Sequence, residues 1–186
     1  MRMKEDAMGN GQLKAGYNLQ HGVDSEYVVW LSIGREPTDT TTLIPFLESL
    51  EERLGWLYSY KKIVADAGYE SEENYGYLGE KGKISFIKPS NYEASKKRSY
   101  KKDIGRVEHM SYDAEKDVYI CHEGKEMPVV GIKSQKTKTG YKREITIYAC
   151  EDCSGCPRKK ECVRGNHSKK PIEERNKTLY ISEKGS

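Results

Sequence analysis

A short apolar run that ends on an aspartate, followed by a turn and a helix start, constrains the fold most strongly. The run Ile63–Ala65 is typical of a strand that is buried on both faces. Gly68 supplies the turn, and Ser71 is a suitable helix N-cap with two glutamates after it. A carboxylate at the carboxyl end of such a strand lies where open sheets bind ligands. Asp66 is therefore a candidate functional residue, and it fits equally well as a cap of the turn.

The first half of the chain continues this pattern on both sides. Residues 17–23 alternate as a strand, residues 27–33 form a more apolar strand, and the two predict a hairpin. Leucines at helical spacing predict a helix over residues 43–54, which Gly55 ends. A helix over 72–78 and a strand over 84–87 follow. The order β-β-α-β-α-β predicts an α/β or α+β fold with a mixed sheet.

Length and composition limit the class of protein. The chain has 186 residues, of which 35% are hydrophobic and 33% charged, so we expect one domain or one domain with a small appendage. Neither a membrane-length apolar run nor a signal segment is visible, which predicts a cytoplasmic protein. In the cytoplasm, the five cysteines are expected to be metal ligands or thiols rather than disulfides.

Basic residues gather in two stretches of the second half, residues 88–109 and 133–142, both of which we interpret as loops. Lysine and arginine interleaved with tyrosine, without an apolar face, suit contacts to a phosphate backbone or simple solvation. The candidate nucleic-acid-binding residues are Lys96, Lys97, Arg98, Lys101, Lys102, Arg106, Lys136, Lys138, Lys142 and Arg143. Strands are predicted over 110–112, 118–121, 127–130 and 143–149, and no element is predicted in the polar tail from residue 163.

The densest chemical signal is a cysteine cluster after the last predicted strand. Cys150, Cys153, Cys156 and Cys162 supply four thiols at knuckle-like spacing, enough for tetrahedral zinc. Cys121 can replace one of them, and His122 and His167 are weaker alternatives. An all-cysteine set would be a structural zinc site, because catalytic zinc keeps an open position. The alternative is a group of reduced thiols without metal.

In their order along the chain, these motifs resemble bacterial insertion-sequence transposases of the DDE type. The matching stretches are Gly16-Tyr17-Asn18-Leu19-Gln20, Asp39 with Leu43-Ile44-Pro45, Ala65-Asp66-Ala67-Gly68-Tyr69, Ile87-Lys88-Pro89 and the Cys150–Cys162 cluster. The resemblance extends over nearly the whole chain. It implies a ribonuclease H-like domain that cuts and joins DNA with two Mg²⁺ ions held by three carboxylates, with transposon ends and target DNA as partners. It also implies a possible homodimer of the full-length form and association with the nucleoid.

Carried over residue by residue, the resemblance assigns Asp66 to the family's second catalytic aspartate and Mg²⁺ ligand. The family's first aspartate precedes the Gly16 strand and its glutamate follows the cysteine cluster, and neither context is present here. Asp39 does not match a catalytic position. We therefore expect a truncated, inactive transposase fragment: residues 1–90 form a partial ribonuclease H-like core, and residues 91–186 form a basic, β-rich insertion. The alternative is a non-enzymatic, zinc-stabilised nucleic-acid-binding module.

Overall fold

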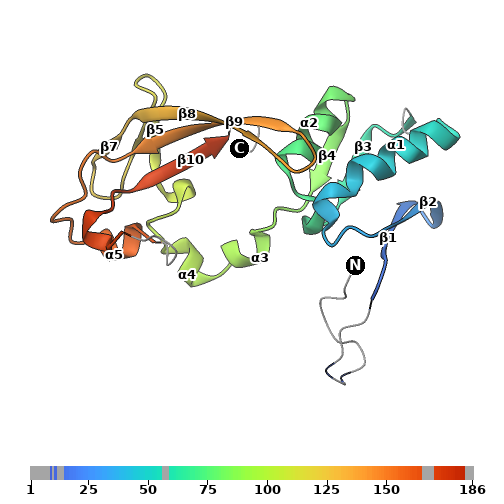
Figure 1. Ribbon diagram of the computed structural model, residues 1–186, viewed down its shortest axis with the longest axis horizontal. Helices are drawn as coiled ribbons and strands as arrows, with labels where there is room; N and C mark the ends of the chain where they lie inside the picture. Colours follow the sequence, from blue (N-terminus) through green and yellow to red (C-terminus); the bar gives the residue numbers. More distant parts are fainter. Residues whose placement is uncertain (1–8, 10, 12–14, 56–58, 165–169, 183–186) are drawn as a thin grey trace. The chain divides into compact units, whose positions relative to one another are not determined.

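A computed structural model describes residues 9, 11, 15–55, 59–164 and 170–182, and it has an α+β fold (Figure 1). The chain divides into two compact units, unit 1 (Met1–Ser90) and unit 2 (Asn91–Ser186), which are described separately. In the described ranges, every helix is too short or too polar to cross a membrane.

Unit 1 begins with the predicted hairpin. Strand β1 (Asn18–Asp24) pairs antiparallel with β2 (Tyr27–Gly34), and Leu19 lies opposite Ile33. The connection passes through Ser25, whose φ of 56° is in the left-handed region. The alternation of the sequence is therefore confirmed as a two-stranded sheet.

The leucine-rich segment forms the main helix of unit 1. After a short 3₁₀ turn, η1 (Asp39–Thr41), helix α1 runs over Leu43–Leu54 and ends at Gly55, whose φ is 62°. A positive φ is tolerated best by glycine, so the predicted end of the helix is confirmed. The buried face of α1 consists of Leu43, Phe46, Leu47 and Leu50.

The predicted strand–turn–helix–strand unit follows. It comprises β3 (Lys62–Ala65), η3 (Ala67–Tyr69), α2 (Glu72–Glu80) and β4 (Ile84–Ile87), with β3 and β4 parallel. The Ser71 hydroxyl accepts from the Asn74 amide at 3.1 Å, which confirms the N-cap. Helix α2 continues past the predicted end at residue 78, because the left-handed turn comes later, at Gly82.

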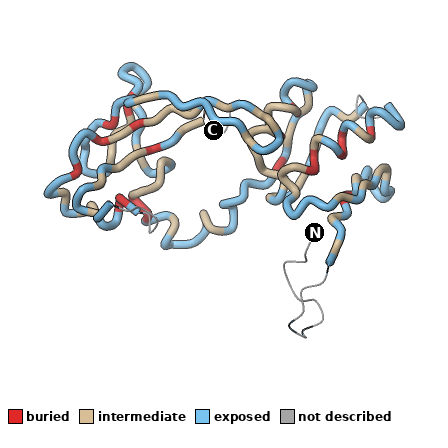
Figure 2. Tube along the Cα trace, in the orientation of Figure 1, coloured by how far each residue is buried: buried red, intermediate tan, exposed pale blue. Residues whose placement is uncertain are grey.

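One hydrophobic core holds these elements together. Its buried members are Leu43, Phe46, Leu47, Leu78 and Ile87, drawn from α1, α2 and β4. The buried positions along α1 are visible in Figure 2. The hairpin joins this core through Trp30, whose indole N–H donates to the Ser49 hydroxyl at 2.8 Å.

The prediction that the Asp66 strand is buried on both faces is wrong. Ile63 and Ala65 pack against the core, but Val64 is 79% exposed and its cross-strand partner Phe86 is also exposed. In the described part of unit 1, the strands form two separate sheets, β1-β2 and β3-β4, rather than one mixed sheet. The core packs against one face of β3 and leaves the other open. The ribonuclease H-like arrangement stays a prediction.

Unit 2 begins with short helices where we expected a basic loop. They are α3 (Tyr92–Ser95), α4 (Arg98–Lys101) and η4 (Val107–His109). Helices of one turn are too short to produce an apolar periodicity, so the sequence pattern does not reveal them.

Two three-stranded sheets make up the rest of unit 2. One is β5 (Ser111–Asp113), β6 (Val118–Ile120) and β7 (Glu126–Met127); the other has the order β10-β9-β8. Its strands are β8 (Val129–Lys136), β9 (Lys142–Ala149) and β10 (Thr178–Ser182). The predicted loop over 133–142 is wrong, because Lys133–Lys136 extend β8, and β10 lies in the tail where no element was expected. Helix α5 (Lys159–Cys162) and η5 (Ile172–Glu174) connect β9 to β10.

The core of unit 2 contains both thiols and apolar side chains. Met127, Tyr148, Cys150, Cys153 and Leu179 are its buried members. The two sheets are also joined by Asp117, which accepts from the Tyr148 hydroxyl at 2.7 Å and the Tyr112 hydroxyl at 2.8 Å. These hydrogen bonds hold the pKa of Asp117 below its ordinary value.

Candidate functional site

The Asp66 carboxylate lies at the carboxyl end of β3, as the sequence predicts. It is exposed, and its Oδ1 accepts from the Gly68 amide at 2.8 Å, so it does cap the turn. Only one oxygen is used in this way. The carboxylate also lines a groove of about 610 Å³ in unit 1, so capping and a functional role are compatible.

A second carboxylate, that of Asp39, lies beside Asp66. A Cβ added at Gly68 would lie 2.9 Å from Asp39 Oδ2 and 3.1 Å from Asp66 Oδ1. Asp39 is half-buried, and its Oδ1 accepts from Asn18 at 2.7 Å and Gln20 at 3.2 Å. Sequence reasoning did not assign Asp39 to the site, because η1 and η3 are far apart in the chain and meet only in the fold.

Tyr69 shows the electrostatic effect of this pair. Burial, followed by the nearby charges of Asp39 and Asp66, raises the pKa of the Tyr69 hydroxyl to about 12. The hydroxyl donates to the Gln20 side-chain oxygen. The carboxyl end of β3 is therefore a region of negative potential, which favours cations.

Carboxylate oxygens are the ligands that Mg²⁺ prefers, and Asp39 and Asp66 fit that chemistry. In the described part of the chain, however, no group of three or more His, Cys, Asp or Glu side chains is arranged to hold a metal ion. The pair therefore places two carboxylates close together, although the resemblance assigns only Asp66 to a catalytic position.

The predicted basic residues of α3 and α4 fall into two groups. Lys96 pairs with Glu93 at 3.2 Å and lies over the Tyr92 ring, and Arg106 pairs with Asp103 at 3.4 Å. The other group is fully exposed and has no side-chain partner among the described residues; it consists of Lys97, Arg98, Lys101 and Lys102. This second group is free to contact an anion.

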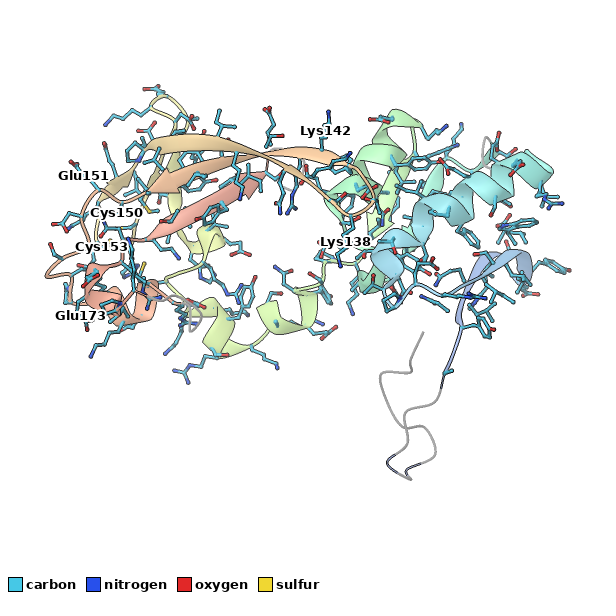
Figure 3. The ribbon with its side chains drawn as sticks, viewed as in Figure 1. Lys138, Lys142, Cys150, Glu151, Cys153 and Glu173 are labelled. Atoms are coloured by element: carbon cyan, nitrogen blue, oxygen red, sulfur yellow. The ribbon has the colours of Figure 1, made fainter. Side chains whose placement is uncertain are left out.

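The β8-β9 hairpin carries the other basic residues toward its tip. Lys136 and Lys142 are both exposed and lie directly opposite each other across the two strands. Lys138 lies in the connecting turn, and Arg143 donates to Gln135 at 2.8 Å. In Figure 3, Lys138 and Lys142 lie at the end of the hairpin remote from Cys150 and Cys153.

All five cysteines line one small cavity of about 20 Å³ in unit 2. The Lys177 amide donates to Cys153 Sγ at 3.4 Å, and burial followed by the neighbouring Cys153 raises the pKa of Cys150 to about 11. The thiols lie together, as expected, although the described side chains do not form a metal-binding arrangement. His122 contacts Arg158 at 2.7 Å, and His167 lies outside the described residues.

Comparison with known protein families finds a similarity within the second unit. Residues 120–184 match the family model of the transposase DDE domain. In this segment the chain is similar to DDE-type transposases. This confirms the resemblance seen in the sequence, and transposases of this family act on DNA. No curated protein and no solved structure matches the chain. The matched segment includes the hairpin lysines and all five cysteines of this transposase relative, but neither Asp39 nor Asp66.

Proposed function

We propose that the chain binds DNA through unit 2, as part of DNA transposition by a DDE-type transposase. The observation that carries the proposal is the opposition of Lys136 and Lys142 across the β8-β9 hairpin. Like charges directly opposite in a sheet repel each other and destabilise the pair. A phosphate group placed between the two ammonium groups would remove this repulsion. Such a protein would act at the nucleoid, in the bacterial cytoplasm.

The outer half of the hairpin suits contact with a duplex. Among the described residues, β10 pairs with residues 145–149 of β9, and Ser134–Lys136 and Lys142–Glu144 beyond them form a two-stranded ribbon. The major groove of B-DNA admits a ribbon of this kind. Because Lys136, Lys138 and Lys142 are the exposed cations of this ribbon and its turn, we expect phosphate contacts and weak sequence selectivity.

Exchanging both hairpin lysines for glutamine tests the proposal. The Lys136→Gln, Lys142→Gln variant should bind duplex DNA more weakly, and the slope of log K against log salt should fall by about 2. Lys116→Gln is the matched control, because Lys116 is an exposed lysine of unit 2 that pairs with Glu126 at 2.9 Å. Fluorescence anisotropy over a salt series measures the affinity and the salt slope of each variant. Equal affinities for the double variant and the parent chain would show that the hairpin does not contact DNA.

For the catalytic step of the family, we propose Asp66 as a Mg²⁺ ligand with Asp39 beside it. Bound Mg²⁺ supplies charge stabilisation for the attacking and leaving oxygens of phosphoryl transfer. Support comes from the two carboxylates beside Gly68 and their effect on the pKa of Tyr69. Two carboxylates hold Mg²⁺ weakly, because this ion gives up its waters reluctantly. We therefore propose that this chain binds DNA without cleaving it.

We further propose that the five thiols hold one structural Zn²⁺. They line a common cavity, and thiolate is the ligand type that structural zinc prefers. Binding would require changes of side-chain rotamer, because the described side chains do not form a metal-binding arrangement. The raised pKa values of Cys150 and Cys162 favour the protonated thiols, and Zn²⁺ binding would displace these protons.

Metal analysis tests the zinc proposal. Purified protein should contain about one equivalent of zinc, and Co²⁺ in its place should give the absorption bands of tetrahedral thiolate coordination. Single Cys→Ser exchanges identify the sulfur that is not a ligand, because that variant alone keeps the metal. If the purified protein contains no metal and its circular dichroism spectrum is unchanged, the cysteines contribute to packing and do not bind zinc.

A further inference from the structure

A buried carboxylate follows the basic helix α4 directly. Asp103 is 8% exposed, and its amide donates to Tyr100 O at 3.0 Å, so its backbone continues the helix. The carboxylate Oδ1 accepts from the Gly105 amide at 3.1 Å, and Oδ2 lies 2.7 Å from Arg164 Nη1 and 3.4 Å from Arg106 Nε. A carboxylate is stable in a buried place only with partners of this kind. Asp103 therefore ties the end of α4 to Arg164, which closely follows the last cysteine in the sequence.

Lys177 makes a second link between the same two segments. Its ammonium group donates to Gly105 O at 2.5 Å and to Cys162 O at 3.3 Å. The two backbones also touch, because a Cβ added at Gly105 would lie 2.6 Å from Cys162 O. Cys162 is the last residue of α5 and is itself buried. An ion pair, a bridging ammonium group and a direct backbone contact therefore fix the end of α4 to the cysteine segment, residues 150–164.

A helix of one turn is not stable alone in water, so α4 depends on such tertiary contacts. Tyr100 supplies further ones: its hydroxyl donates to Glu108 at 2.9 Å, and the Arg106 guanidinium lies 3.7 Å from the centre of its ring. The residues that anchor α4 differ from its exposed cations. These α4 cations, on the helix and directly beside it, are Lys97, Arg98, Lys101 and Lys102. Their spacing therefore depends on anchors that do not themselves face solvent.

From these contacts we propose that Asp103 is a positioning residue for DNA binding: it holds α4 on the cysteine segment and so gives the α4 cations a fixed spacing for phosphate contacts. The proposal rests on the DNA binding proposed for unit 2. Charges that are already ordered bind with a smaller loss of conformational entropy than charges on a mobile segment. The DNA affinity of α4 is thereby coupled to the packing of the cysteine segment. The hairpin lysines are held by the β8-β9 ladder instead.

Exchange of Asp103 for asparagine separates positioning from simple charge. Removal of a negative charge from a DNA-binding unit raises its affinity for DNA by electrostatics alone. Asp103→Asn should instead weaken DNA binding about fivefold, because the charged pair with Arg164 is lost and α4 is released. Glu115→Gln is the matched control: it removes an exposed carboxylate of unit 2 and should bind DNA at least as tightly as the parent chain. Fluorescence anisotropy with a labelled duplex measures the dissociation constant of each variant.

Combined variants show whether the loss of affinity acts through the α4 cations. When all four α4 cations are glutamine, adding Asp103→Asn should change the affinity by less than about twofold, because the positioned charges are already gone. In the Lys136→Gln, Lys142→Gln variant, Asp103→Asn should weaken binding by the same factor of about five as in the parent chain. A loss of the same size in all three backgrounds would show a general loss of fold, and would overturn the proposal.

Gly105→Ala tests the backbone contact without changing any charge. The added methyl group should push the two segments apart at Cys162 O and weaken DNA binding by a similar factor. Gly131→Ala is its control, because a Cβ at Gly131 meets nothing within 4 Å.

Two results distinguish failure of this proposal from failure of the proposed function. If the α4 and hairpin glutamine variants bind DNA weakly while Asp103→Asn binds as tightly as the parent chain or more tightly, positioning by Asp103 is overturned and DNA binding by unit 2 stands. If the glutamine variants bind DNA as tightly as the parent chain does, the proposed function is overturned, and the role of Asp103 with it.

Discussion

At the scale of single residues, the fold brings Asp39 and Asp66 together beside the α-carbon of Gly68. The contact has a steric consequence at the glycine, because both carboxylate oxygens lie where a side chain would begin. The site therefore depends on a residue that carries no chemistry of its own. Asp66 is found by its position after an apolar run, whereas Asp39 is found only through its neighbours.

Gly68→Ala should destabilise unit 1 by about 1–2 kcal/mol, because the added methyl group displaces the two carboxylates. Gly79→Ala is the matched control: Gly79 lies in α2, and a Cβ there meets nothing within 4 Å. The Gly79→Ala exchange should raise the free energy of unfolding of unit 1 by about 0.5–1 kcal/mol, because alanine has the higher helix propensity. Urea unfolding of the two variants measures the difference. Equal effects in both would mean that the carboxylates move aside without cost.

Asp117 predicts a pH dependence in unit 2. Hydrogen bonds from Tyr148 and then Tyr112 lower its pKa in the folded chain, so the ionised carboxylate stabilises the fold. This stabilisation is complete above the unfolded pKa of about 4 and is lost as the pH falls through the lower folded value. The stability difference between the parent chain and Asp117→Asn should therefore be constant near neutrality and shrink in acid. A difference that grows on acidification would contradict the assignment.

At the scale of elements, the basic residues occupy a one-turn helix and a hairpin rather than two loops. Helix α4 and the residues beside it hold four cationic side chains that have no partner among the described residues. The hairpin holds the opposed pair Lys136 and Lys142. Regular backbone structure gives these charges defined spacings, which a flexible loop would not.

Exchange of Lys97, Arg98, Lys101 and Lys102 for glutamine should lower DNA affinity for all sequences and reduce the salt slope by about 3 to 4. Lys96→Gln should have a smaller effect per residue, because the Lys96 ammonium already pairs with Glu93 and Tyr92. Anisotropy titrations at several salt concentrations compare the two. If Lys96→Gln alone matches the fourfold exchange, the division into paired and unpaired cations is wrong.

At the scale of the whole molecule, the carboxylates belong to unit 1 and the basic surfaces and thiols to unit 2. Mg²⁺ binding and DNA binding should therefore respond to different substitutions. Asp66→Asn is expected to leave DNA affinity unchanged and to weaken Mg²⁺ binding. Electrophoretic mobility shifts measure the DNA affinity, and calorimetric titration with Mg²⁺ measures the metal binding. Strand cleavage by the chain in Mg²⁺, lost in Asp66→Asn, would show that further ligands assemble and that the proposed inactivity is wrong.

Much of this molecule follows from local sequence. The hairpin, α1 with its glycine end, the Ser71 cap and the Asp66 turn each depend on neighbours a few residues apart, so the pattern predicts them. The transposase relationship is also visible in the order of the motifs and is confirmed over residues 120–184.

Tertiary structure decided what depends on distant partners. The open face of Val64, the separation into small sheets and the meeting of Asp39 with Asp66 all require elements from different parts of the chain. An apolar strand sequence predicts what a strand can bury, but which of its faces and edges are covered depends on the neighbours that the fold supplies.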